Sequence, residues 1–535
     1  MSKQNVNLEK AQPYLREFLE DTANQKLVQS NDLLNLGKAV LNAKAKDIED
    51  RNGTLQGRDR ERIPKCLDPL ETALLLLFTK EFRIIRTSDS EGNGKVKRLA
   101  MYKDGIYTTD SDQIMKEICE VSPTFDPQKC YTVLHHLKLN AGEAVNINHE
   151  KYLIPLKNGI YDTHAKVLLP FTPDFVFLTK LAVAYNPQAT NPTILHKDGT
   201  EWDVDSWIGE LAADSDVQTL IWQVIRDCIT ISSSSGKAVI FYSESGNNGK
   251  GTLGQLIKNI LGKGNYSAIA INEFKNDAKR ATIFGKAANI ADENDTSAYL
   301  DSAKDFKACV TADDIIINDK YEKAFAYQFF GANIQMMNGL PRTKDKTDSL
   351  YRRIILVPFL KSFTNNGECK YIKEEYIYRE EVLEYVLKKA LEVDFDEYIV
   401  PQVCQELLGD FKEDNNPVLQ FWKELEPEPE LKWDLIPIAF LYDLYVSWVK
   451  RTNPAGRPTS RKVFKEDISK LFEESDVWLF KNGTVNTGKK MDADEPLITE
   501  YNLVKWMDSQ AASSPPPQQR AFVRANTYRS CLVRL

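Results

Sequence analysis

The chain has 535 residues and a formal net charge of −8, which excludes nucleic-acid binding by overall charge and leaves only local basic patches for such contacts. Its hydrophobic content of 42% is ordinary for globular proteins, and at roughly 150 residues per domain the length predicts several domains. The densest apolar run, residues 73–78, is too short to cross a bilayer.

The sequence offers no targeting or zinc-binding signal. Its first residues are polar and do not form the apolar core of a signal peptide. The eight Cys include no Cys-x-x-Cys pair, and the five His lack the spacing of metal ligands, which favours a reducing compartment. We therefore expect a cytoplasmic protein without a membrane partner.

The first two segments carry no identified chemistry. Residues 1–65 are predicted to form a helical arm and linker, and residues 66–225 an α/β region. Within the second segment, the run Trp202–Trp207 contains Asp203 and Asp205, whose spacing is compatible with a metal site. No His lies nearby, however, and a helix is predicted from Ile208, for which an Asp is a good cap, so capping is favoured over primase chemistry.

Residues 238–261 follow the pattern strand, glycine-rich turn, lysine, helix. Glycines allow backbone N–H groups to surround an anion, a helix N-terminus adds its dipole, and a lysine supplies a full charge. The pattern predicts a nucleotide-phosphate site, and the alternative is an ordinary Gly/Asn turn. The residues of this turn are Gly246, Asn247, Asn248, Gly249, Lys250, Gly251 and Thr252. Two departures from the usual pattern are Glu244 in place of its first glycine and a hydroxyl displaced by one position, at Thr252.

Three later features suit the same chemistry. Small apolar residues lead into Asp292 and Glu293, a pair that can hold Mg²⁺ and polarise an attacking water, although such pairs are also common on surfaces. An apolar strand then delivers Asn338, which can hold the water or contact a γ-phosphate, or can simply form a turn. Paired arginines, Arg352 and Arg353, precede a further strand and can neutralise phosphate charge or pair with Asp345 or Asp348.

Residues 313–325 alternate in polarity around an Asn-Asp-Lys turn and are predicted to form a hairpin. Near the C-terminus, helices over 435–449 and from Ser460 are followed by 477–480 and an Asn482-Gly483 turn, which predicts a winged-helix module. Basic residues stand at the entry of its second helix: Arg457, Arg461, Lys462 and Lys465. Of these, Arg461 and Lys462 are expected to contact DNA; a module for protein contacts is the alternative. Residues 511–535 contain arginines without acids and are predicted to be a disordered basic tail.

Taken together, the order of these motifs resembles superfamily 3 helicases, particularly replication proteins of phages, plasmids and mobile elements related to poxvirus primase-helicases. The resemblance covers about residues 100–475 and is carried by 249–252, 292–293, 338–341, 352–353 and 357–359, with 156–162 and 184–187 matching the region before the helicase core. It implies a P-loop AAA+ core at 226–400, between an α/β N-terminal region and a C-terminal winged-helix module at 401–510.

The resemblance also implies roles for individual residues. ATP and Mg²⁺ are the expected cofactors, with Thr252 and Asp292 near the metal, Glu293 activating water and Asn338 sensing the γ-phosphate. An arginine, Arg353 or Arg352, is expected to come from a neighbouring subunit of a homo-hexameric ring. Lys320 matches the lysine that grips a DNA phosphate in the hairpin, assisted by Lys323, and Tyr321 can stack on a base.

The sequence therefore predicts a ring-forming, ATP-dependent DNA helicase that acts on single- and double-stranded DNA, with host or element replication proteins as possible partners. Two alternatives stay open. One is an origin-binding initiator that uses ATP as an assembly switch. The other is a P-loop NTPase that does not act on DNA.

Overall fold

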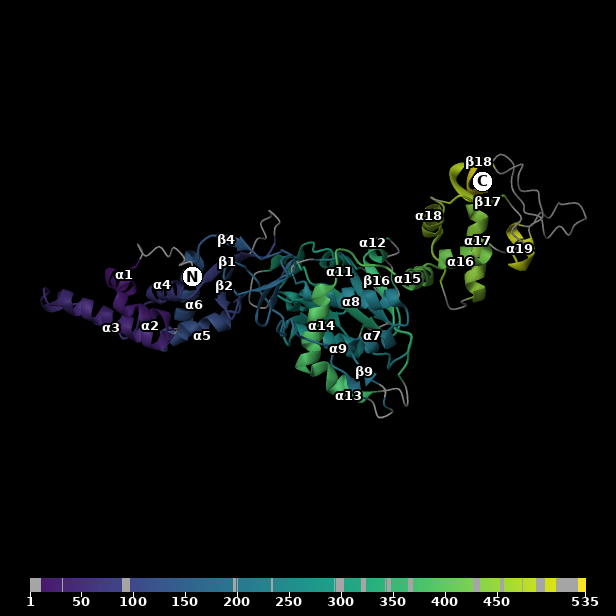
Figure 1. Cartoon of the computed structure of the whole chain (residues 1–535). Coiled ribbons are helices and arrows are strands. Elements are labelled where there is room, and N and C mark those ends of the chain that lie inside the picture. The colour runs from purple at the N-terminus through teal and green to yellow at the C-terminus, as the bar shows by residue number, and fades with distance from the viewer. Residues whose placement is uncertain are drawn as a thin grey trace, which may run out of the picture. The chain divides into compact units, whose positions relative to one another are not determined.

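The computed structural model describes residues 11–30, 32–88, 97–195, 199, 201–231, 234–292, 294, 303–318, 324–341, 343, 348–363, 369–426, 434–452, 457–473, 475–486, 496–506 and 528–535. The chain divides into two compact units, residues 1–408 and 409–535 (Figure 1). Helix α15 (Gln402–Asp414) runs across the division. In the described part of the chain, no helix combines the length and apolarity needed to cross a membrane.

The first unit begins with six helices and a small mixed sheet that share one hydrophobic core. The helices are α1 (Pro13–Glu20), α2 (Gln25–Gln29), α3 (Leu33–Asn52), α4 (Pro69–Thr79), α5 (Ser111–Val121) and α6 (Pro127–Asn140), with 3₁₀ turns η2 (Thr22–Asn24) and η3 (Gly57–Asp59). The sheet order is β3-β2-β1-β4, from β1 (Phe82–Arg86), β2 (Lys97–Lys103), β3 (Ile106–Thr108) and β4 (Ala144–Asn146).

The helical prediction for residues 1–65 is confirmed over 13–52, but the expected separate arm is wrong. Leu15 of α1 and Val40 of α3 are buried in the same core as Leu74 of α4 and Val133 of α6. Helix α4 starts in a capping box, in which Asp68 and Glu71 each accept the other's backbone N–H. The first helices therefore belong to a domain that continues past residue 65.

Short antiparallel strands and two helices connect this region to the central sheet. The strands are β5 (Leu153–Leu156), β6 (Gly159–Asp162), β7 (Val167–Leu169), β8 (Ile194–Leu195) and β9 (Glu201–Trp202), and the helices are α7 (Val204–Leu211) and α8 (Ser215–Ile229). Helix α7 starts four residues before the predicted Ile208. Asp203 caps it by accepting the Ser206 N–H at 2.8 Å, and Asp205 pairs with Lys389, so the capping interpretation is confirmed.

A five-stranded, wholly parallel sheet forms the centre of the unit, in the order β11-β12-β15-β10-β16. Its strands are β10 (Ala238–Tyr242), β11 (Tyr266–Ser267), β12 (Ala288–Ala291), β15 (Ala332–Met337) and β16 (Ile354–Pro358). All side chains of β12, β15 and β16 are buried, as expected for a parallel sheet covered on both faces. The predicted strands at 238–242 and before Asn338 are thereby confirmed.

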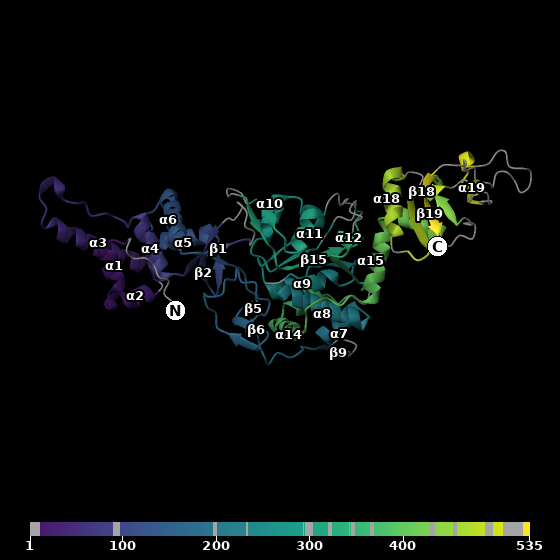
Figure 2. The same ribbon diagram turned by 90° about the horizontal axis from the view of Figure 1, so that it is seen from above.

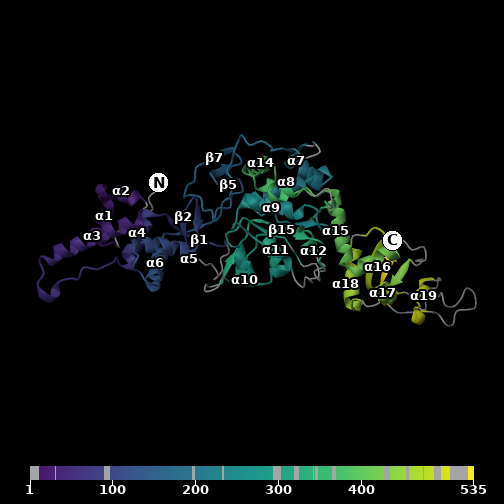
Figure 3. The same ribbon diagram turned by 90° about the horizontal axis from the view of Figure 1, so that it is seen from below.

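Helices cover both faces of this sheet. Opposite views place α8, α9 (Lys250–Leu261) and α14 (Glu380–Glu392) on one face and α10 (Asp277–Arg280) and α11 (Lys304–Val310) on the other (Figures 2 and 3). The remaining elements are α12 (Asp348–Tyr351), α13 (Lys370–Glu374), η4 (Ile271–Glu273), η5 (Ala281–Ile283) and η7 (Tyr376–Tyr378). The strands of the predicted hairpin are β13 (Ile315–Ile317) and β14 (Phe325–Tyr327), paired antiparallel, which confirms that prediction.

The second unit is a small α/β module with its own core. It contains α16 (Pro417–Leu425), β17 (Leu435–Pro437), α17 (Ile438–Thr452), α18 (Arg461–Leu471), β18 (Trp478–Asn486), α19 (Pro496–Glu500), η8 (Val504–Trp506) and β19 (Tyr528–Arg534). The sheet order is β17-β19-β18, antiparallel throughout, so β19 is the central strand.

Three expectations for this unit need correction. Residues 435–437 form a strand, since they pair with β19, and the helix starts only at Ile438. Asn482 and Gly483 lie inside β18, where the pairing shifts register, and do not form a hairpin tip. The tail predicted to be disordered is ordered over 528–534, because this segment pairs with two strands and buries Cys531 and Leu532.

Candidate nucleotide-binding site

The carboxyl ends of β10, β12 and β15 meet at one edge of the sheet because the strands are parallel. The glycine-rich turn follows β10, Asp292 follows β12 and Asn338 follows β15. A pocket of about 830 Å³ opens at this edge and is lined by residues 246–252, Asp292 and Asn338. Motifs that are far apart in the sequence thus line one cavity, while Glu293 lies outside the described residues.

The turn needs glycine at position 249. Gly249 caps α9 with a φ of 84°, in the left-handed region that favours glycine. A Cβ there would lie 2.2 Å from Leu211 Cδ2, so the Leu211 side chain of α7 would have to move to admit it. Asn247 also has a positive φ, which asparagine tolerates better than most residues. The chain is thereby bent so that the start of α9 faces the pocket.

Lys250 is buried at the start of α9, and its amine reaches the residues that follow the adjacent strands β10 and β15. Its Nζ donates to Asn338 Oδ1 at 2.8 Å and also to Ser243 Oγ. Burial lowers the pKa of this amine to about 8, because both of these acceptors are neutral and cannot offset the desolvation of the charge. An anion entering the pocket would supply the missing counter-charge.

The turn is braced by contacts that the motif did not predict. The Asn248 amide donates to Ser243 Oγ and to the Ser245 carbonyl. The Phe363 N–H donates to the Asn247 carbonyl at 2.7 Å, which ties the turn to the segment after β16. Glu244, the departure from the usual pattern, is exposed and lies outside the pocket lining.

Asp292 and Thr252 supply oxygen atoms to the same pocket. Hydroxyl and carboxylate oxygens are ligands that suit Mg²⁺, which keeps several waters and substrate oxygens in such sites, so the donor set fits this ion. The Asp292 carboxylate accepts from Lys258, whose side chain is buried on α9 and lies over the Tyr266 ring. Asp292 therefore has a cationic partner that sequence analysis missed.

Arg352 and Arg353 do not reach this pocket. They precede β16, and Ile354 pairs with Ala238 at the start of β10, so both arginines lie at the opposite edge of the sheet. Arg352 is exposed, whereas Arg353 Nη1 donates to the Ser349 carbonyl at 2.6 Å and its Nε is buried without a hydrogen-bond partner. Within one chain, the geometry separates the arginines from the phosphate site.

The predicted DNA-binding residues fall into two groups. Lys320, Tyr321 and Lys323 lie outside the described residues, although the strands on either side of them are described. Arg461 and Lys462 are exposed at the start of α18, whose N-cap Ser460 accepts the Val463 N–H.

Sequence reasoning missed several residues of the pocket wall. Besides the predicted residues, the lining includes Trp202, Trp207, Phe363, Lys373 and Tyr378. The two tryptophans belong to the run Trp202–Trp207, for which the sequence suggested a role only for the aspartates. Phe363, Lys373 and Tyr378 come from the segment after β16, and no local motif marks them.

The fold and site define a mixed α/β protein with a parallel sheet and a glycine- and lysine-containing turn at its carboxyl edge. Three family models match successive segments: D5 N terminal like over 112–210, a family of unknown function (DUF5906) over 241–353, and Poxvirus D5 protein-like over 413–503. The chain is therefore similar to D5 proteins over 112–210 and over 413–503.

A helicase-named protein of Acanthamoeba polyphaga mimivirus, L207/L206, is 23% identical over 240 residues, covering 43% of this chain. The match spans only 24% of that protein's length. Among solved structures, the apo NrS-1 C-terminal region (305–718) is 15% identical and covers 78% of this chain and 96% of that chain, with a TM-score of 0.42. A JCV helicase with a bound acetamide compound is 14% identical and covers 42% of this chain and 60% of that chain, with a TM-score of 0.24. TM-scores this low do not establish a shared fold.

Proposed function

We propose that this chain is a D5-type DNA helicase that hydrolyses ATP and works as a homo-hexameric ring during replication of a phage, plasmid or genomic island. The observation that carries the proposal is the Lys250–Asn338 hydrogen bond, which joins the phosphate-type turn to the polar end of the adjacent strand. The matches to D5 family models and to a helicase-named relative support the DNA substrate.

In this proposal the turn residues 246–252 bind the phosphates through backbone N–H groups, and Lys250 neutralises their charge. Thr252 and Asp292 would hold Mg²⁺, which polarises the transferred phosphoryl group. Glu293 removes a proton from the attacking water, and Asn338 contacts the γ-phosphate and orients that water. Arg353 lies at the far edge of the sheet, so in a ring it would contact the nucleotide of a neighbouring subunit and not that of its own chain.

The proposed DNA contacts have two parts. The segment between β13 and β14, with Lys320, Tyr321 and Lys323, would contact a strand in the ring channel. The second unit, with Arg461 and Lys462 on α18, would act as a winged helix and contact duplex DNA. Its three-stranded sheet and two adjacent helices support this assignment.

The first experiment is steady-state ATP hydrolysis with and without single-stranded DNA. We expect strong stimulation by DNA, abolished in Lys250→Ala and retained in Lys263→Ala, a matched control at an exposed lysine just beyond α9. Robust hydrolysis that DNA does not change would favour an NTPase that does not act on DNA. Absence of hydrolysis in the wild type would indicate that the glycine-rich segment is an ordinary Gly/Asn turn and not a phosphate site.

The ring is tested by mixing two variants that should each be inactive alone, Arg353→Ala and Lys250→Ala. Mixing them should restore part of the hydrolysis, because a Lys250→Ala subunit supplies its arginine to the intact site of an Arg353→Ala neighbour. No recovery on mixing would refute an arginine acting between subunits. Arg352→Ala, tested in the same way, decides which of the two arginines acts.

The origin-binding initiator remains the second candidate. It is favoured by the second compact unit, in which a pocket is lined by the basic residues Arg461, Lys465, Lys505 and Arg529. Unwinding of long forked DNA by catalytic amounts of protein would count against it. Unchanged DNA affinity in a Lys320→Ala, Lys323→Ala double variant would remove the proposed channel contact.

A further inference from the structure

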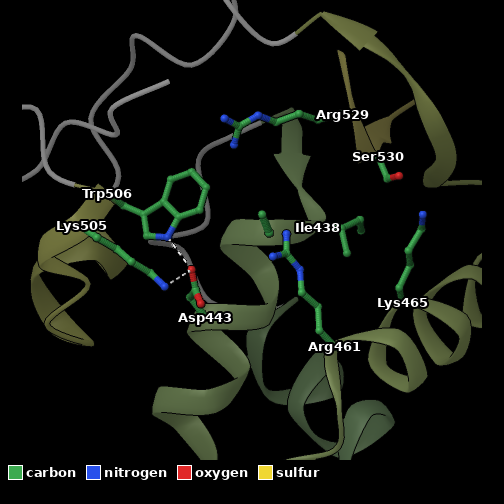
Figure 4. Close-up of a pocket in the computed structure, with 9 residues that line it drawn as sticks. Ile438, Asp443, Arg461, Lys465, Lys505, Trp506, Arg529 and Ser530 are labelled. Carbon is green, nitrogen blue, oxygen red and sulfur yellow. Dashed lines mark hydrogen bonds and ion pairs between the residues drawn. The ribbon is translucent and has the colours of Figure 1, made fainter. Parts of the chain in front are cut away.

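The second unit contains a basic hollow that no comparison assigns. It has a volume of about 650 Å³ and lies between the start of α17, α18, η8 and β19 (Figure 4). Four of its lining side chains are basic: Arg461, Lys465, Lys505 and Arg529. Acidic and basic residues nearly balance over 409–535, so this concentration is local and does not follow from composition.

The fold brings these cations together from separate segments. Arg461 and Lys465 are four residues apart on α18 and therefore share one face of the helix. Figure 4 shows both side chains extending toward the strand that carries Arg529 and Ser530. Sequence analysis could not join them, since it assigned residues 511–535 to a tail.

The charges in the hollow are largely uncompensated. Asp443 is the acid in the lining, and it already accepts from Lys505 Nζ at 2.8 Å and from Trp506 Nε1 at 2.8 Å. Lys465 Nζ donates to the neutral Asn482 Oδ1 at 2.8 Å. Among the described residues, no ion pair joins Arg461, Lys465 or Arg529 to an acid.

We propose that this hollow binds the phosphodiester backbone of a DNA strand. The inference rests on the proposed function in taking DNA as the ligand. Guanidinium groups, here those of Arg461 and Arg529, are usual partners of backbone phosphates, whereas Ser530 Oγ already donates to Asn482 Oδ1 at 3.0 Å. The only ring in the described lining, Trp506, is almost fully buried and its N–H is already used, so no aromatic face is free for a base. The contact is therefore independent of sequence.

The hollow also changes which face of α18 meets DNA. Lys462, predicted as the companion of Arg461, is not part of the lining, whereas Lys465 is. A helix inserted into a groove through Arg461 and Lys462 and a strand held by Arg461 and Lys465 are therefore distinguishable by substitution.

The test uses the full chain without nucleotide and measures binding of labelled mixed-sequence DNA by fluorescence anisotropy across a salt series. In the Arg461→Gln, Arg529→Gln double variant, we expect the slope of log affinity against log salt to fall by about 2, because two phosphate groups are no longer neutralised. Affinity should fall about tenfold for each of the two arginines, by a similar factor on two unrelated sequences.

Two further variants make the result decisive. Lys470→Gln removes an exposed charge from the same helix outside the hollow and should leave the salt slope unchanged. Arg461→Lys with Arg529→Lys keeps the charges and should retain most of the affinity, which separates a loss of charge from misfolding.

An unchanged slope in the Gln double variant would overturn the proposal, as would equal losses in Lys470→Gln. Weaker binding of inorganic phosphate with unaltered DNA binding would show a small-anion site and overturn it as well. Because no nucleotide is present, a positive result stands even if DNA fails to stimulate hydrolysis. In that case the proposed helicase fails and the DNA site remains.

Discussion

Replacing Lys250 by Met should stabilise the nucleotide-free protein while abolishing nucleotide binding. The side chain is 5% exposed, and burial lowers its pKa from 10.5 to about 8. The folded state therefore binds fewer protons than the unfolded state between these pH values, so stability rises with pH across that window and the buried charge costs most below pH 8. At about 1.4 kcal/mol per pH unit, the cost at pH 7 is at most about 3 kcal/mol.

The assay is thermal unfolding of the nucleotide-free chain, following the transition of the first unit. At about pH 7 the Met variant should melt a few degrees higher, since about 1 kcal/mol shifts Tm by roughly 1 °C in a unit of about 400 residues. At about pH 9.5 the gain should shrink to about 1 kcal/mol, because wild-type Lys250 is then already neutral in the folded state.

Lys250→Arg is the matched control, because arginine keeps its charge at both pH values and should bring no gain. A Met variant that melts below the wild type at pH 7 would refute the reasoning. So would a gain of equal size at both pH values, since only a titrating amine makes it depend on pH.

Three further outcomes follow from other contacts. Gly331→Ala should lower the unfolding free energy by about 1–3 kcal/mol in urea titration, because the new Cβ would lie 2.1 Å from the Ala287 carbonyl oxygen of the neighbouring strand; an unchanged midpoint contradicts this. Adding Mg²⁺ should raise nucleotide affinity more in Lys258→Met than in the wild type, as measured by calorimetry, because Asp292 no longer has to leave its buried partner to bind the ion. A smaller rise than in the wild type would mean that Lys258 positions the carboxylate instead. Burial raises the pKa of Asp227 from 3.8 to about 6, so between these pH values the folded state holds a proton that the unfolded state has released, and stability falls by at most about 3 kcal/mol as pH rises through this window; Asp227→Asn should flatten the stability profile between about pH 4 and 6.

The parts of the site that the sequence predicted are those encoded in short contiguous segments. The turn before Lys250 could be placed because strand, glycine and helix signals lie within one stretch of chain. Asp292 and Asn338 could be placed because each directly follows an apolar strand. Parallel pairing then brings all three to one edge of the sheet. Their chemical roles remain predictions.

The residues that sequence analysis missed depend on contacts between distant segments. Lys258 is an ordinary charged residue of an amphipathic helix until β12 places Asp292 beside it. Phe363 has no motif, and only the folded chain connects it with the turn, through its hydrogen bond to Asn247 and the position of its ring near Gly249. In the second unit, Asn482-Gly483 is a typical turn signal, but pairing with β19 turns it into an irregularity within a strand.

The central position of β19 makes the second unit sensitive to truncation at its C-terminal end. The middle strand of this sheet, β19, is the last of the three in the sequence and begins at residue 528. β17 and β18 each pair with β19 and not with each other. Cleavage of the chain between β18 and β19 would leave a fragment held to the rest without a covalent link, through sheet hydrogen bonds, the buried Cys531 and Leu532, and the contacts of Arg534 with Asp434 and Trp478. Loss of that fragment would expose two unpaired strand edges, which are templates for aggregation. A truncated version ending near residue 510 is therefore expected to precipitate, however innocuous its missing residues look in the sequence.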